Sequence, residues 1–246
     1  MGAIIRKFVA VLTSLVALAA CSKHDPILPG VRSAIFTTDA PTVLNQNISD
    51  LPDVANKYDV VPCPYTQDAT NTIKDGDKKI FSGFPVPNSV RSTQRPVCSG
   101  KYVYAGLTTG ELVKINSATR QVVWIADIFR ASNMTGGASV VDIVAPIIVS
   151  GADVYVGGLG DAFCRINASS GVKKWCANIG TAQPFVIAGP ATYVVGTDNN
   201  LYALRNSDGA IYWRTEIAKQ SAPTFADKII TVGRQKIDAQ TGQIIK

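Results

Sequence analysis

A pattern of thirteen residues occurs three times without gaps in the second half of the chain. The windows are 112–124, 163–175 and 201–213, and each ends on a tryptophan. An Ile or Leu lies nine residues before each tryptophan, and a tyrosine lies eleven residues before that Ile or Leu. Such self-similarity is typical of proteins that stack copies of one supersecondary unit, because a single unit cannot bury its apolar face alone.

The residues of one repeat predict four short antiparallel strands. A β-forming run at 192–195 is followed by a polar turn at 196–200 and a second strand. Asn206–Gly209 then leads the chain into a strand that ends at Trp213, and its glycine suits a turn position with positive φ. A further short strand, opened by proline, lies upstream at 183–187. We therefore predict an all-β fold, a β-propeller of four-stranded antiparallel blades.

A fourth window, 236–246, keeps the register of the repeat but departs from it in two ways. It places Lys246 where tryptophan is expected, and it lacks about four residues between Gly233 and Ile237. We therefore predict a partial propeller with about four recognisable blades. The regular spacing of the tryptophans indicates a structural role, so we expect them to pack between blades and to bind no ligand: Trp124, Trp175 and Trp213.

The N-terminus has the features of an export signal. Arg6 and Lys7 precede an apolar run of 13 residues from 8 to 20, which ends in small residues directly before Cys21. A charged region, an apolar region and a small-residue cleavage site form a signal peptide, and the run is shorter than the roughly 20 residues that a spanning helix needs. An ordinary signal peptide with a chance cysteine is the alternative to lipid attachment at Cys21.

Three segments follow from these patterns: a signal peptide at 1–20, a tether with an irregular segment at 21–94, and the partial propeller at 95–246. The middle segment is rich in proline, which favours extended chain and loops. Only 33–37 and 79–84 within it are expected to form strands. A loop insertion, 132–137, lengthens the gap between the first two repeats.

Charge and cysteine content exclude several functions. Removing the signal peptide lowers the net charge from +6 to +4, and the Lys and Arg residues are spread out, so we expect no nucleic-acid binding. The four cysteines beyond Cys21 match no zinc spacing and leave three disulfide connectivities, or free thiols, open: Cys63, Cys98, Cys164 and Cys176. His24 is the single histidine, so no Ser-His-Asp or Cys-His arrangement is available, and we expect no catalytic residues, metal or cofactor.

The repeat and the N-terminus together resemble a known family. The run from strand through Asn/Asp and Thr/Ser-Gly to tryptophan is similar to the PQQ-type propeller repeat, and Leu18–Cys21 resembles the lipobox of bacterial lipoproteins. With Pro26–Gly30, they resemble BamB-like outer-membrane assembly lipoproteins over 17–30 and 95–246. The resemblance implies lipidation of Cys21 and, since Ser22 is not Asp, a place on the periplasmic face of the outer membrane.

The chain is shorter than the eight-bladed pattern of this family, and three interpretations stay open. It is a truncated product, a reduced propeller, or a chain in which 31–94 contains one or two diverged blades. An unclosed stack leaves an exposed sheet edge, so self-association or a partner is expected there.

The resemblance implies a non-catalytic scaffold for the assembly and insertion of outer-membrane β-barrel proteins. Its expected partners are the barrel assembly protein, with its periplasmic domains, and the membrane. One alternative is a structural or ligand-binding propeller lipoprotein, or a decayed copy, without an assembly role. The other is a PQQ-dependent dehydrogenase, which resembles a full eight-bladed ring with a calcium site, a catalytic carboxylate and adjacent cysteines.

Overall fold

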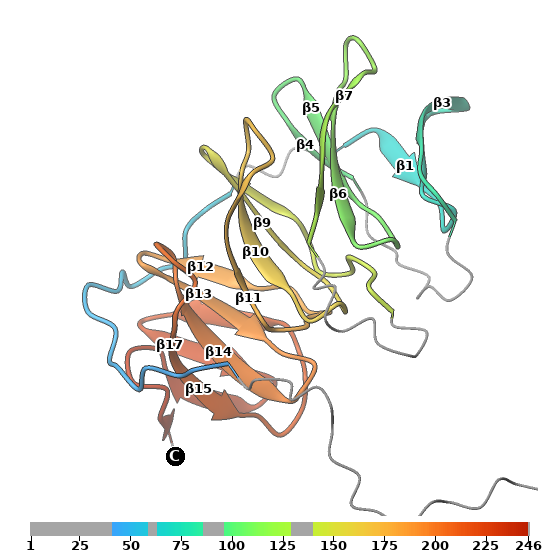
Figure 1. Cartoon of the computed structure of the whole chain (residues 1–246). Coiled ribbons are helices and arrows are strands. Elements are labelled where there is room, and N and C mark those ends of the chain that lie inside the picture. Colours follow the sequence, from blue (N-terminus) through green and yellow to red (C-terminus); the bar gives the residue numbers. More distant parts are fainter. Residues whose placement is uncertain (1–40, 59–62, 86–95, 129–139, 246) are drawn as a thin grey trace, which may run out of the picture. The chain divides into compact units, whose positions relative to one another are not determined.

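The fold was analysed in a computed structural model that describes residues 41–58, 63–85, 96–128 and 140–245. Within these ranges the chain consists of strands, turns and irregular segments, and nineteen strands form five antiparallel sheets (Figure 1). The prediction of an all-β fold with four-stranded blades is therefore confirmed. A search of the same ranges finds no helix long and apolar enough to cross a membrane. Residues 1–40, 132–137 and Lys246, with the expectations placed on them, lie outside the described residues.

Four sheets have four strands each, and the strands of each sheet are consecutive in the chain and lie in sequence order. Their bounds are β4 Val97–Ser99, β5 Tyr102–Gly106, β6 Glu111–Asn116 and β7 Val122–Asp127; β8 Ile148–Ser150, β9 Asp153–Gly157, β10 Phe163–Asn167 and β11 Lys173–Ala177; β12 Val186–Ala188, β13 Ala191–Val195, β14 Asn200–Arg205 and β15 Ile211–Glu216; and β16 Pro223–Ala226, β17 Ile229–Val232, β18 Gln235–Asp238 and β19 Ile244–Ile245.

In three of the four-stranded sheets, an Asn or Asp side chain closes the turn before the last strand. The Oδ1 atoms of Asn116, Asn167 and Asp238 each accept hydrogen bonds from the backbone N–H groups two and three residues ahead. This Asx turn explains why the repeat has Asn or Asp at this position. The shortened segment between Gly233 and Ile237 is a tight connection from β17 to β18, and the fourth sheet keeps all four strands.

The remaining sheet has three strands, β1 Tyr65–Gln67, β2 Thr72–Asp75 and β3 Lys78–Ser82. Its hydrogen bonds identify it as a diverged blade. Gly83 N–H donates to the Asn71 carbonyl, and the equivalent bond in the next sheet runs from Ile128 to Gly110. Both acceptor residues have positive φ. We therefore assign β1–β3 to the second, third and fourth strands of a blade.

The sequence prediction for this region was incomplete. It placed one strand at 79–84, whereas the structure has strands at 65–67, 72–75 and 78–82. The repeat signal fails here for two physical reasons. Gly76–Asp77 connects β2 to β3 in place of the longer Asn-initiated turn, and β3 contains no tryptophan. A pattern search based on tryptophan and glycine therefore finds no match.

Consecutive sheets pack face to face through apolar side chains. Each of four buried clusters combines residues of two neighbouring sheets, from β1–β3 against β4–β7 to β12–β15 against β16–β19. Phe163 and Tyr193 are among the largest fully buried side chains. All described residues belong to one compact unit, 40–246. Stability therefore resides in the sheet-to-sheet interfaces, as expected for a repeat protein.

Candidate functional site

The three tryptophans form a repeated joint between consecutive sheets. The ring of Trp124 lies against Gly171, that of Trp175 against Gly209, and that of Trp213 against Gly242. A Cβ added to these glycines would lie 2.8, 2.5 and 2.6 Å from the nearest ring atom. Trp175 and Trp213 are buried, at 8% and 4% exposure, and Trp124 is half-buried. We call the contact of each tryptophan with the glycine of the next sheet the Trp–Gly joint.

The first repeat has no glycine at this position, and the structure explains why. Arg120 occupies the place of Gly171, also with positive φ, at 60°. The three strands of the sheet before it contain no tryptophan. The Arg120 side chain extends toward that sheet, where a guanidinium nitrogen lies 3.5 Å from a carboxylate oxygen of Asp75. An ion pair thus replaces the Trp–Gly joint at this interface.

Polar groups fix the orientation of the indoles. The Nε1 atoms of Trp124 and Trp175 donate to the carbonyls of Ala168 and Asn206, at 3.2 and 2.9 Å. The equivalent carbonyl at the third interface, Ala239, accepts instead from the Tyr193 hydroxyl at 3.0 Å. Trp213 Nε1 is buried without a hydrogen-bond partner among the described residues. The third joint therefore relies on packing more than the first two.

Two cationic side chains support the first two joints, and this role was not predicted from the sequence. Lys114 and Arg165 occupy the same position of the repeat, and each donates to the carbonyl that its tryptophan also contacts. Lys114 is 4% exposed, and its Nζ lies 3.8 Å from the centre of the Tyr102 ring. Burial, aided by the nearby charge of Lys101, lowers the pKa of Lys114. The third repeat has Ala203 here, which is why Tyr193 supplies the donor.

Asp153 holds two cations within the sheet β8–β11. Its carboxylate forms ion pairs with Arg165 on the next strand and Lys174 on the strand after that. Burial alone would raise the pKa of Asp153, but the hydrogen bonds and charges of Arg165 and Lys174 outweigh it and lower the pKa below its usual value. Because Arg165 also reaches the Asn206 carbonyl, Asp153 positions a side chain that links two sheets.

Replacing Asp153 by Asn is expected to lower the free energy of unfolding by about 1–2 kcal/mol at pH 7, because a largely buried carboxylate loses two partly screened ion pairs. The folded-state pKa is lowered, so this stabilisation is present above the unfolded-state pKa of about 3.9 and is lost as pH falls through the folded value. Urea unfolding at pH 7 and pH 3 measures it. Asp77→Asn in an exposed turn is the control, and an equal loss at both pH values would contradict the assignment.

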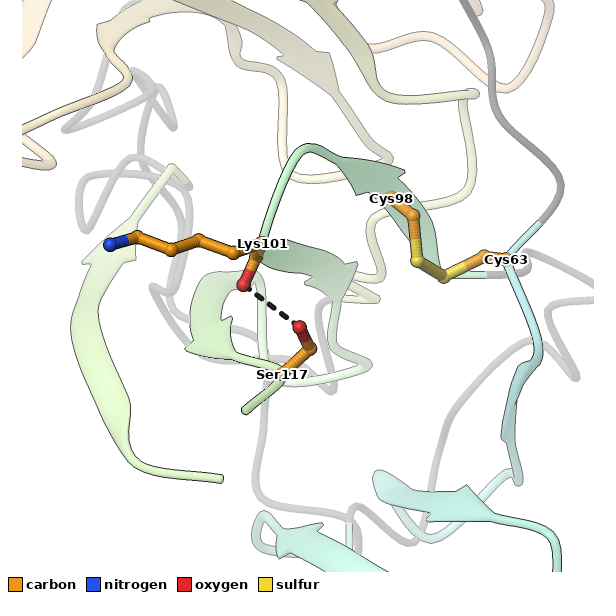
Figure 2. The surroundings of a disulfide bond; sticks show 4 residues. All are labelled: Cys63, Cys98, Lys101 and Ser117. Atoms are coloured by element: carbon orange, nitrogen blue, oxygen red, sulfur yellow. Dashed lines mark hydrogen bonds between the residues drawn. A yellow bond between two sulfur atoms is a disulfide. The ribbon is translucent and has the colours of Figure 1, made fainter. Parts of the chain in front are cut away.

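The structure forms two disulfides, which the sequence left open. Cys63 pairs with Cys98, and Cys164 pairs with Cys176. The first joins the segment before β1 to strand β4, as Figure 2 shows, and the Ser117 hydroxyl beside it donates to the Lys101 carbonyl at 3.0 Å. The second lies between register partners on β10 and β11. A disulfide-forming compartment agrees with the predicted export signal.

Residues 41–58 cross the last two sheets, and we call them the strap. They begin beside β15, where Val43 forms a parallel bridge with Ile211 (Figure 1). Farther on, Val54 bridges to Ala226 of β16, and Asn56 N–H donates to the Ile187 carbonyl of β12. Ile48 and Leu51 of the strap are buried in the cluster between these two sheets. The strap thus pairs with terminal strands of both sheets and covers the apolar cluster between them.

Other strand edges carry exposed apolar side chains. Val122, Val123 and Ile125 on β7 are 43–48% exposed, and Ile244 and Ile245 on β19 are 54% and 41% exposed. Within the described ranges, no group of three or more His, Cys, Asp or Glu side chains could hold a metal ion. The edges of β7 and β19 thus expose apolar side chains that another macromolecule could contact.

Sequence comparison relates the chain to one family. The family described as "Outer membrane protein assembly factor BamB" matches residues 82–215 and 181–244. Curated proteins of that name are similar at 24% identity over 128 residues in Alkalilimnicola ehrlichii and 25% over 181 residues in Yersinia pestis. The matched segments cover 52% and 70% of this chain but only 33% and 45% of the relatives. The chain thus spans less than half the length of the curated relatives that it matches.

Solved structures share the fold. BamB from Moraxella catarrhalis superposes with a TM-score of 0.51 at 15% identity, covering 80% of this chain and 67% of that one. A quinohemoprotein alcohol dehydrogenase from Pseudomonas putida HK5 superposes with a TM-score of 0.54 at 13% identity, covering 84% and 45%. Both likenesses concern the propeller architecture, which unrelated functions share.

Proposed function

Since the chain belongs to the family of the outer membrane protein assembly factor BamB, we propose that it is a non-catalytic scaffold for assembling and inserting β-barrel proteins in the outer membrane. The observation that carries the proposal is the family match over 82–244, the region that contains the three Trp–Gly joints. Three polar side chains of this region hold the strands and sheets together: Lys114, Asp153 and Arg165. A scaffold uses such a stack as a rigid support for its loops and edges.

The proposed location is the periplasmic face of the outer membrane, with a lipid anchor on Cys21. Intact-mass measurement of the mature protein is expected to show acylation at Cys21 and an N-terminus created by cleavage before it. Cys21→Ala is expected to lose the acyl mass and to leave the membrane fraction, because stable anchoring needs two or more buried chains. Ser22→Ala is the matched control. Acylated, membrane-bound Cys21→Ala protein would contradict the assignment.

The proposed partner is the outer-membrane barrel assembly protein, contacted through its periplasmic domains. The test is affinity purification of the lipidated protein from detergent-solubilised outer membranes, with mass spectrometry of what accompanies it. Co-purification of a large barrel protein with periplasmic domains supports the proposal. Purification without such a protein favours a structural or ligand-binding lipoprotein, and the absorbance of bound quinone favours a dehydrogenase; either result contradicts the proposal.

A further inference from the structure

The outer strand β7 has an apolar edge, whereas the equivalent strand β11 carries lysines and β15 is paired with the strap; β19 also exposes Ile244 and Ile245. Counting from the tryptophan, the two preceding residues are Val122 and Val123 in β7 but Lys173 and Lys174 in β11. The first sheet has Lys78 and Lys79 on its last strand, both exposed. Lysines on an edge strand prevent pairing with other chains. Strand β7 lacks this protection and exposes Val122, Val123 and Ile125 instead.

The strap shows what an apolar edge of this fold accepts. In β15 the residue equivalent to Val122 is Ile211, which is 3% exposed because Val43 of the strap pairs beside it. The N–H groups of Leu44 and Gln46 donate to the carbonyls of Ile211 and Tyr212 at 2.9 and 3.0 Å. The chain thus already adds an extended, apolar segment to the outer edge of one sheet. At β7 the same position is 43% exposed.

The backbone of β7 is available for the same pairing. β7 is the terminal strand of its sheet. The bond from Ile128 N–H to the Gly110 carbonyl sets the phase of the β6–β7 ladder, in which hydrogen-bonded and non-hydrogen-bonded pairs alternate. Ile125 and Asp127 fall in non-hydrogen-bonded pairs, so their N–H and C=O groups point away from β6. A strand placed there meets donors, acceptors and apolar side chains together.

We propose that the β7 edge, around Val122–Asp127, binds an extended segment of an unfolded outer-membrane barrel protein by strand addition. This inference rests on the proposed function. The occupant fits chemically because transmembrane β-strands are about ten residues long and alternate apolar with polar side chains. Such a segment can place its apolar side chains beside Val123 and Ile125 while its backbone pairs with the free groups of β7.

The test uses the full lipidated protein in detergent and a fluorescein-labelled ten-residue peptide of alternating valine and threonine. Binding is measured by fluorescence anisotropy. The double variant Val123→Lys/Ile125→Lys copies the lysine protection of β11, and we expect it to raise the Kd about tenfold. Val172→Lys is the matched control, since this exposed valine lies outside any strand, and its Kd should equal that of the wild type. A peptide N-methylated at alternate residues should not bind.

Three results would overturn the inference: no binding by the wild type, equal binding by the double variant, or binding of the N-methylated peptide, which would indicate apolar adhesion alone. Sedimentation of the wild type as a dimer that the double variant abolishes would assign the edge to a second copy and also overturn it. Circular dichroism checks that the variants fold. If the peptide does not bind but the assembly protein co-purifies, the inference about β7 is wrong and the proposed function stands. If the peptide binds but the assembly protein does not co-purify, the proposed function is wrong and β7 remains a strand-binding edge.

Discussion

Trp175→Ala is expected to lower the free energy of unfolding by about 3–5 kcal/mol, the usual cost of truncating a buried tryptophan. The ring is 8% exposed, lies against Gly209 and packs near Phe163 and Tyr155. Its indole nitrogen also donates to the Asn206 carbonyl, which would lose that donor. The loss is comparable with the total stability of many domains, so the variant should unfold or aggregate.

Urea unfolding, followed by tryptophan fluorescence and circular dichroism, measures this effect. Val172→Ala, three residues earlier and 64% exposed, is the control and should leave the midpoint almost unchanged. An unchanged midpoint for Trp175→Ala would show that the tryptophan is not a joint between sheets.

Gly209→Ala is expected to destabilise the same joint from its other side. Its φ of 76° lies in the left-handed region, which costs other residues roughly 1–2 kcal/mol, and the new Cβ would lie 2.5 Å from the Trp175 ring. Overpacking of this kind typically adds about 1–3 kcal/mol, so the total is about 2–5 kcal/mol.

Gly151→Ala separates the two contributions. Gly151 also has positive φ, at 58°, but an added Cβ meets nothing within 4 Å. Thermal unfolding should show a smaller loss for Gly151→Ala than for Gly209→Ala, and the difference measures the clash with Trp175. Equal losses would mean that backbone conformation alone requires the glycine.

The four-stranded sheets could be predicted because their determinants are local. The Asn-initiated turn, the glycine with positive φ and the tryptophan lie within one window, so a short pattern captures them. The role of Gly209 becomes clear only in the structure, since its partner Trp175 belongs to the preceding repeat. The exchange of Gly for Arg120 has the same origin, because the strands of the preceding sheet contain no tryptophan.

Features that depend on pairs distant in sequence could not be predicted. The Cys63–Cys98 disulfide joins residues 35 apart, and spacing alone allowed three connectivities. The strap pairs Val43 with Ile211 across most of the chain, and nothing local in 41–58 marks it as an added strand. The cations at Lys114 and Arg165 were visible in the aligned windows, but their burial was not, because charged residues are usually exposed.

The molecule is a series of sheets packed face to face and held together by Trp–Gly joints, and its strand edges differ in protection. The interior residues stabilise the stack, and the strands at its margins differ from repeat to repeat. Function in such a protein is expected at the positions that break the repeat, and the exposed apolar edge of β7 is one of these among the described strands.

The most direct test of the proposed role is quantification of folded β-barrel proteins in outer membranes from cells that lack this chain. Heat-modifiable mobility in gels separates folded from unfolded barrels. We expect reduced folded barrel levels, restored by the wild-type chain but not by Trp175→Ala. Unchanged levels in the deletion strain would contradict an assembly role.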